Sequence, residues 1–145
     1  KLSDWYPGDD YVDWIGISVF GHAYDNSDFG IHCDNVLQFA KLKKKPVMIA
    51  ESNPVKGIYK DNIDAWDQWF VNFFTFIYNK NIKAVSFINQ DWKTLSIQGI
   101  EEWKDARLYN NEQISKAWFM ETNKDRYLKQ STELFEQLGY DKNEK

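Results

Sequence analysis

Short apolar segments alternate with amphipathic helical segments along this chain, and this alternation restricts its fold more than any other feature. The strand-like segments lie at 11–20, 47–50 and 82–89. The helical segments lie at about 34–42, 63–77, 112–122 and 124–138, with long loops at 21–30 and 93–111. Strands that are separated by helices pair in parallel through right-handed crossovers. The sequence therefore predicts an α/β fold with a parallel sheet.

The periodicity within these segments supports their assignment. Apolar residues in 63–77 recur at spacings of three and four, which is typical of a helix with one buried face. β-Branched and aromatic residues fill 82–89, as is typical of strands. Asp34 is the expected N-cap of the first long helix, and Gly139 is the expected C-cap of the last one. These start and stop signals set the helix bounds that we predict.

The strand at 47–50 ends at a carboxylate. Its four apolar residues are typical of a strand buried on both faces, with Pro46 before it and a predicted turn at 52–54 after it. Glu51 therefore lies at the carboxyl end of a buried strand, where an ionised group is costly unless it has a partner or a function. In β/α barrels the catalytic residues lie at this end of the strands. Glu51 is the leading candidate for a catalytic residue, and a strand-end salt bridge is the alternative.

Composition excludes several classes of function. The net charge of −4 arises from interspersed charges of both signs, which does not indicate a nucleic-acid or anionic-membrane partner. No apolar stretch approaches the roughly 20 residues of a membrane-spanning helix. His22 and His32 are the only histidines, and their surroundings match no metal-ligand pattern. We therefore expect no metal, no cofactor, no nucleic acid and no membrane span.

The number of strands limits the architecture. A (β/α)8 TIM barrel has eight strands in about 250 residues, whereas this sequence of 145 residues predicts three strands. Two architectures remain: a small open α/β sheet, or the last portion of a barrel whose front part is absent. No strand is followed by a Gly-rich phosphate loop, which counts against an open sheet that binds nucleotides.

Three stretches of the chain, 5–16, 45–54 and 82–92, resemble glycoside hydrolase family 26, which holds β-mannanases and related endo-β-glycanases. The segment 102–107 resembles a Trp-x-Asp-x-Arg element that follows the last barrel strand in many members. The resemblance implies a (β/α)8 barrel that hydrolyses β-glycosidic bonds with retention. It also implies that residues 1–145 are the C-terminal part of one catalytic domain, with strands six to eight, and that the N-terminal part of the barrel is missing.

The resemblance also implies roles for individual residues. Glu51 is the expected nucleophile, while the acid/base glutamate is expected upstream of this chain, so that this chain by itself is expected to be inactive. Trp92 matches the tryptophan that forms the platform for the sugar being cleaved. A nucleophile must stay ionised, which requires nearby hydrogen-bond donors. Ser52 and Asn89 are candidates for those donors.

One departure concerns the end of the expected strand six. Mannanases commonly carry Asp-x-Tyr there, with the tyrosine hydroxyl on the nucleophile, but this chain has Ser18-Val19-Phe20, and Phe20 has no hydroxyl. Tyr24, in the following loop, is a candidate replacement. Aromatic residues make up 17% of the chain, and sugar clefts need flat apolar faces. The expected substrate-binding residues are Phe20, Tyr24, Asn89, Trp92 and Trp103.

Asp105 and Arg107, within the last family-like segment, are interpreted as a structural ion pair rather than as a ligand clamp. The predicted function is a retaining glycoside hydrolase that cleaves a β-linked polysaccharide of the mannan, mixed-linkage glucan or β-xylan type by double displacement. The alternatives are an inactive relative that only binds polysaccharide, and a non-catalytic half-barrel fragment. Because such polymers lie outside cells, the family implies a secreted or cell-surface protein.

Overall fold

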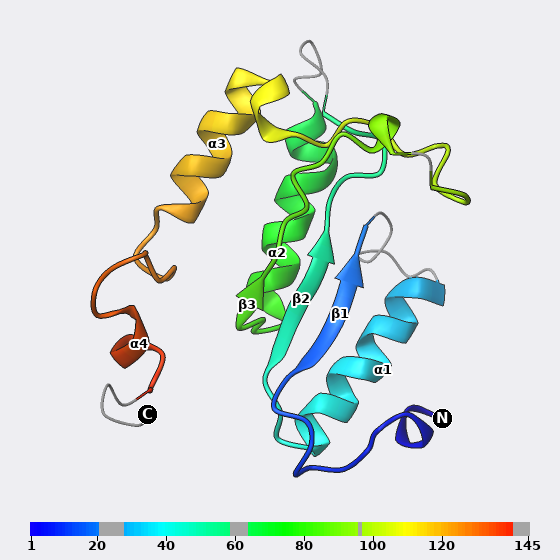
Figure 1. Cartoon of the computed structure of the whole chain (residues 1–145), viewed down its shortest axis with the longest axis vertical. Helices are drawn as coiled ribbons and strands as arrows, with labels where there is room; N and C mark the ends of the chain where they lie inside the picture. The colour runs from blue at the N-terminus through cyan, green and yellow to red at the C-terminus, as the bar shows by residue number, and fades with distance from the viewer. Residues whose placement is uncertain (21–27, 59–63, 96, 141–145) are drawn as a thin grey trace.

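The computed structural model describes residues 1–20, 28–58, 64–95 and 97–140. Its centre is a parallel sheet of three strands in the order β1-β2-β3 (Figure 1). The strands are β1 (Ile15–Val19), β2 (Val47–Ser52) and β3 (Ala84–Val85). Within this sheet, β1 pairs with β2 and β2 pairs with β3, both in parallel. The predicted α/β class with a parallel sheet is therefore confirmed.

Helices connect and follow these strands. They are α1 (Asp28–Leu42), α2 (Val71–Asn79), α3 (Glu112–Thr122) and α4 (Leu134–Gln137). Shorter turns are η1 (Leu2–Asp4), the π-helical η2 (Trp66–Phe70), η3 (Trp92–Thr94) and η4 (Leu108–Asn110). No helix in the part of the chain that the structure describes is long and apolar enough to cross a membrane.

The two faces of the sheet differ. Ile17, Val19 and Ile49 are buried and pack in one cluster with the aromatic side chains of η2 and α2. That cluster is the core, and its largest fully buried members are Phe70, Phe73, Ile49, Ile58, Ile114 and Val19. Burial of this much aromatic surface stabilises the fold through the hydrophobic effect. We call the opposite face, which carries Gly16, Ser18, Met48 and Glu51, the open face, because Gly16 and Glu51 are exposed there.

A β-bulge interrupts β2 just before Glu51. Ile17 pairs with Ile49, but the next residue, Ser18, pairs with Glu51, so Ala50 has no partner in β1. One extra residue shifts the side-chain alternation of a strand by one position. As a result, Glu51 shares the open face with Ser18, while Ser52 is fully buried on the core side.

The strand at 11–20 is shorter than predicted. β1 begins at Ile15, whose backbone N–H donates to the carbonyl of Pro46, immediately before β2 starts. Upstream, the Tyr11 N–H closes a turn onto the carbonyl of Gly8 (3.2 Å). Residues 11–14 precede the point at which β2 can pair with them, so their alternation alone does not make a strand.

The strand at 82–89 is also shorter, because its ladder with β2 is irregular. Backbone N–H groups of Lys83, Ser86 and Ile88 donate to carbonyls of β2 or its end, at 2.9, 2.8 and 2.8 Å. The acceptors are Val47, Ile49 and Ser52. The donors are spaced by three and then two residues, whereas the acceptors are spaced by two and then three. The segment therefore follows β2 to its end, although only β3 forms a regular ladder.

Two helix predictions were wrong. Asp34 does not cap α1, which begins six residues earlier at Asp28; its carboxylate instead pairs with the Lys80 ammonium at 2.7 Å. Gly30 lies inside this helix, where glycine costs about 1 kcal/mol relative to alanine. Tertiary packing, which buries Cys33 and Ala40 against the sheet, outweighs that cost.

The last predicted helix, 124–138, is reduced to α4. Residues that follow α3 instead pack on α2, where the Tyr127 and Tyr78 hydroxyls lie 3.0 Å apart and the Arg126 guanidinium lies 3.6 Å from the centre of the Tyr78 ring. The backbone of residues 123–127 forms turns and bends, not a helix. The cap at Gly139 is confirmed, because Gly139 has a φ of 86° and two backbone bonds close the end of α4 there.

Helix α3 matches its predicted bounds of 112–122. The Asn111 side chain accepts hydrogen bonds from the N–H groups of Gln113 and Ile114 and so forms its N-cap. The predicted helix at 63–77 corresponds to η2 and α2, and its first residue lies outside the described residues.

Candidate active site

Glu51 lies on the open face at the carboxyl end of β2. Its side chain is exposed, and its Oε2 accepts a hydrogen bond from the Ser18 hydroxyl at 2.9 Å. The two residues are 33 positions apart in sequence and are register partners in the β1–β2 ladder. An exposed carboxylate with a hydroxyl donor on one oxygen is suited to nucleophilic or acid/base chemistry.

The donors that the sequence suggested for Glu51 are used elsewhere. The Ser52 hydroxyl donates to the carbonyl of Ser86 at 2.7 Å. The amide oxygen of Asn89 accepts from the Leu108 N–H at 2.7 Å, which ties the end of the third strand segment to η4. Sequence reasoning therefore missed Ser18 as the donor, although its position two residues before Phe20 puts both side chains on the same face of β1.

Three of the predicted substrate-binding residues form an aromatic cluster at the same end of the sheet. The Phe20 and Trp103 ring centres are 4.7 Å apart, and Trp103 meets Trp92 edge-to-face at 5.0 Å. The Phe20 carbonyl accepts from the Trp69 indole N–H at 2.9 Å, which anchors the end of β1 to the core. Tyr24, the fourth aromatic candidate, lies outside the described residues, as does His22.

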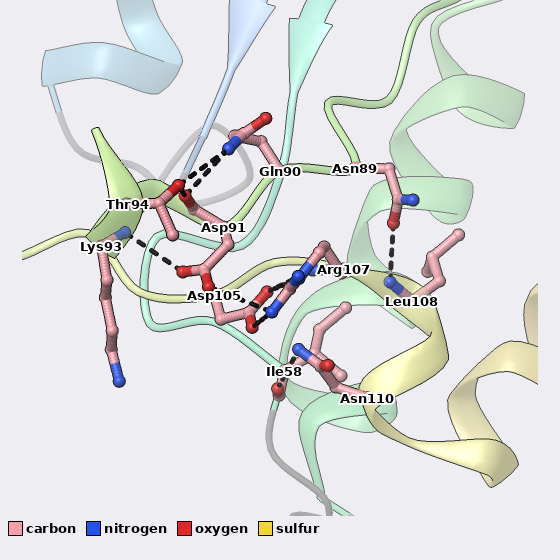
Figure 2. Close-up of polar contacts among 10 residues, drawn as sticks. All are labelled: Ile58, Asn89, Gln90, Asp91, Lys93, Thr94, Asp105, Arg107, Leu108 and Asn110. Carbon is pink, nitrogen blue, oxygen red and sulfur yellow. Dashed lines mark hydrogen bonds and ion pairs between the residues drawn. The ribbon is translucent and has the colours of Figure 1, made fainter.

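Trp92 begins the short helical turn η3, and its neighbours fix that turn (Figure 2). The Asp91 carboxylate accepts from the Lys93 N–H at 3.2 Å and so caps η3. The Asp91 carbonyl accepts from the Thr94 hydroxyl at 2.7 Å and from the Gln90 side-chain amide at 2.9 Å. The Trp92 indole Nε1 is buried and has no hydrogen-bond partner among residues that the structure describes.

Arg107 joins the loop of Trp103 to the turn of Trp92. Its guanidinium contacts Asp105 twice, at 2.8 and 2.5 Å, and Asp91 once, at 3.0 Å (Figure 2). The predicted structural ion pair is confirmed, and Asp91 extends it to a triad. The Arg107 guanidinium lowers the pKa of the Asp105 carboxyl to about 2. A charged and hydrogen-bonded pair of this kind holds both segments in one arrangement.

The loop after β2 packs tightly against the same segment. Gly57 has a φ of 78°, and a side chain there would meet the Lys104 Cβ at 2.6 Å and the Asp105 carbonyl at 2.7 Å. The Ile58 N–H donates to that carbonyl at 2.7 Å. Glycine is required because only it tolerates both this φ and this approach. The chain between β3 and α3 thus crosses the carboxyl ends of the strands and is held there (Figure 1).

A shallow groove of about 420 Å³ adjoins the indoles. Trp92 and Trp103 line it together with Leu95 and Ile97, and polar side chains including Glu101 complete it. Leu95 is 40% and Ile97 48% exposed. Apolar faces with a few polar groups are typical of small-ligand sites. No group of three or more metal-binding side chains that could hold an ion is found among the described residues.

Because of its charge, Asp105 is expected to make stability depend on pH. Its folded pKa of about 2 lies below the usual value of 3.8, so its contribution is full above about pH 4 and is lost as the pH falls through 2. In the native protein, Asp105→Asn is expected to lower the free energy of unfolding by about 2 kcal/mol at about pH 7 and by about half as much at about pH 3. Urea denaturation at both pH values measures the difference.

The exposed Asp125 provides the control, since Asp125→Asn removes the same charge away from the triad. It is expected to change stability by less than about 0.5 kcal/mol. A loss for Asp105→Asn that is equal at both pH values would contradict a role for the carboxylate charge.

The sequence of this chain is similar to a protein family and to known proteins. The family model for glycosyl hydrolase family 26 matches residues 1–113. A beta-1,3-xylanase from a Vibrio species is 30% identical over 163 aligned positions, which cover 97% of this chain and 35% of the relative. A beta-1,3-xylanase from an Alcaligenes species is 31% identical, with 97% of this chain and 34% of the relative covered. The chain spans about a third of the length of these curated relatives.

Proposed function

The chain belongs to glycosyl hydrolase family 26, and from that premise we propose that it forms the C-terminal part of a (β/α)8 catalytic domain that hydrolyses a β-linked polysaccharide. Residues 1–145 carry strands six to eight, and the rest of the barrel lies upstream. The family is one of TIM barrels, and the share of the relatives that the chain spans supports a partial barrel. The open sheet is the architecture that this proposal sets aside.

The observation that carries the proposal is the position of Glu51. It stands at the carboxyl end of a central strand, exposed on the open face, with a hydroxyl donor on one oxygen. In a barrel, that face is the interior and that end carries the active site. A strand-end salt bridge is the weaker explanation, because the partner of the carboxylate among the residues that the structure describes is a neutral hydroxyl.

The mechanism is double displacement. The Glu51 carboxylate attacks the anomeric carbon while an upstream glutamate protonates the leaving oxygen, and a glycosyl ester forms on Glu51. Water activated by the upstream residue then cleaves that ester, which restores the β configuration. Retention by this route requires the two carboxyl groups to lie about 5–5.5 Å apart.

The sugar being cleaved rests on Trp92. Trp103 supports that indole edge-to-face, Phe20 packs in turn on Trp103, and both border the cleft. Tyr24 and Asn89 complete the set of substrate-binding residues, and Asn89 uses its amide nitrogen because its oxygen is already bonded to Leu108. Flat aromatic faces bind sugar rings through the apolar C–H side of the ring.

We take β-1,3-xylan as the substrate, because the two relatives carry the name beta-1,3-xylanase. Phe20, which stands where mannanases commonly have a tyrosine, agrees with a substrate other than mannan. The native protein is expected to release reducing ends from β-1,3-xylan at least about 10²-fold faster than from mannan or mixed-linkage glucan. A reducing-sugar assay on the three polymers measures this, and a rate on mannan equal to that on xylan would contradict the assignment.

The Ser18-x-Phe20 departure favours one second candidate, a barrel relative that holds polysaccharide without cleaving it. Affinity electrophoresis in β-1,3-xylan would then show retardation of the native protein, while the reducing-sugar assay stays at background. Either function acts on a polymer outside the cell, so we propose a secreted or cell-surface location.

A further inference from the structure

Among the residues that the structure describes, Ser18 donates a hydrogen bond to the Glu51 carboxylate, and the sheet holds both residues in register. The Ser18 Oγ donates to Glu51 Oε2 at 2.9 Å, and the two residues are partners in the β1–β2 ladder. The bulge at Ala50 creates this pairing. Without it, Glu51 would follow Val47 and Ile49 onto the core side of the sheet. Bulges often redirect a side chain next to an active site in this way.

The backbone that carries Ser18 is rigid. The next residue, Val19, is fully buried in the core, and the Phe20 carbonyl is bonded to the Trp69 indole at 2.9 Å. Two residues before Ser18, Gly16 is paired with Met48 in the β1–β2 ladder. The Ser18 hydroxyl therefore stands on a strand that is fixed on both sides of it, whereas the Glu51 side chain has three rotatable bonds.

We propose that Ser18 is a positioning residue for the nucleophile: its hydroxyl holds Oε2 of Glu51, so that Oε1 points to the anomeric carbon. This inference rests on the proposed role of Glu51. Holding one oxygen removes side-chain freedom before the attack, which raises the fraction of molecules in a reactive geometry. Ser18 does this from β1, in place of the tyrosine hydroxyl that the Phe20 position lacks.

The attack can be measured apart from the acid/base step with 2,4-dinitrophenyl 2-deoxy-2-fluoro-β-1,3-xylobioside. Glu51 Oε1 forms a bond to the anomeric carbon, the bond to the phenolic oxygen breaks, and dinitrophenolate departs with the electron pair and needs no proton. The fluorine slows hydrolysis, so the ester accumulates. Released dinitrophenolate gives the rate, and the mass of the labelled peptide identifies the residue.

In the native full-length protein, the label is expected on Glu51. Ser18→Ala is expected to lower the labelling rate about 10- to 100-fold, and Ser18→Thr is expected to restore most of it, because threonine keeps the hydroxyl and suits a strand. The Kd for xylobiose is expected to stay within about twofold in both variants. Ser115→Ala, which removes a hydroxyl in α3, is the matched control and is expected to label at the wild-type rate.

The outcomes separate the two proposals. No labelling of the wild type, or labelling at another residue, overturns the role of Glu51 and with it this inference. Labelling at Glu51 at an unchanged rate in Ser18→Ala overturns only the positioning role. Ser18→Thr as slow as Ser18→Ala would also overturn it, because the effect would then come from the strand and not from the hydroxyl.

Discussion

Glu51→Gln in the native protein is expected to lower kcat on β-1,3-xylan by about 10⁴-fold or more. Glutamine keeps the shape of the side chain, and its amide oxygen still accepts from Ser18, but an amide does not form the glycosyl ester. The side chain is exposed, so the free energy of unfolding is expected to change by less than about 0.5 kcal/mol. Reducing-sugar kinetics and urea denaturation measure the two quantities. A kcat near that of the wild type would remove Glu51 from the mechanism.

Replacing Glu51 with a smaller residue tests its role by a gain of reaction with an added nucleophile, whereas Glu51→Gln tests it by a loss. Glu51→Ala leaves space on the open face, and with a dinitrophenyl xylobioside and added azide it is expected to form the α-configured glycosyl azide. Azide then attacks where the carboxylate stood and dinitrophenolate departs, so one inversion replaces two. Glu102→Gln is the control, because it removes an exposed carboxylate in the loop beyond the groove. It is expected to keep kcat within about twofold, and a fall as large as that of Glu51→Gln would mean that loss of charge alone explains the effect.

The fold was predictable where local signals and burial agree. The strand that starts after Pro46 and the helix capped by Asn111 both carry strong signals, and their starts match the structure. Strand ends were not predictable, because they depend on a partner. Ile15 begins β1 since the ladder with β2 begins there, and Tyr11, with the same alternation, has no strand beside it.

The helix errors have a similar cause. Gly30 is a local signal for a loop, yet α1 passes through it because packing on the sheet decides the outcome. A helix is predicted at 124–138, yet the backbone at Tyr127 is not helical and its hydroxyl lies 3.0 Å from that of Tyr78 in α2. Pairings between residues about 50 positions apart leave no trace in a local pattern.

The candidate site, like the fold, could be predicted from the sequence only in part. The end of the buried strand, and therefore Glu51, could be found from the apolar run alone. Strict alternation, however, would turn Glu51 to the side of Ile49, into the core, where an ionised carboxylate is costly. Ala50, which has no partner in β1, prevents this by shifting the alternation, and the four apolar residues carry no sequence signal for a bulge. The partnership with Ser18 depends on the same bulge, which is why the sequence alone points to Ser52 and Asn89 as donors instead.

Trp92→Ala in the native protein is expected to lower kcat/KM on β-1,3-xylan by about 10²-fold. An indole that contacts a sugar ring supplies a large share of the binding energy, and truncating such a residue typically costs 2 kcal/mol or more. A platform under the reacting sugar contacts both the ground state and the transition state, so KM is expected to rise while kcat changes little. Steady-state kinetics on β-1,3-xylan measures both terms.

The effect of packing must be separated from the effect of binding, because Trp92 also supports Trp103 edge-to-face. Trp92→Phe keeps a ring against Trp103 and a flat face toward the cleft, and it is expected to recover most of kcat/KM. Trp5→Ala removes an indole that is 88% exposed and that comes from η1 and its end, not from the cleft loops, so it is expected to be neutral. If Trp92→Ala lowers the unfolding free energy but leaves kcat/KM unchanged, the indole only fills space beneath the loop. The sugar would then rest on another surface.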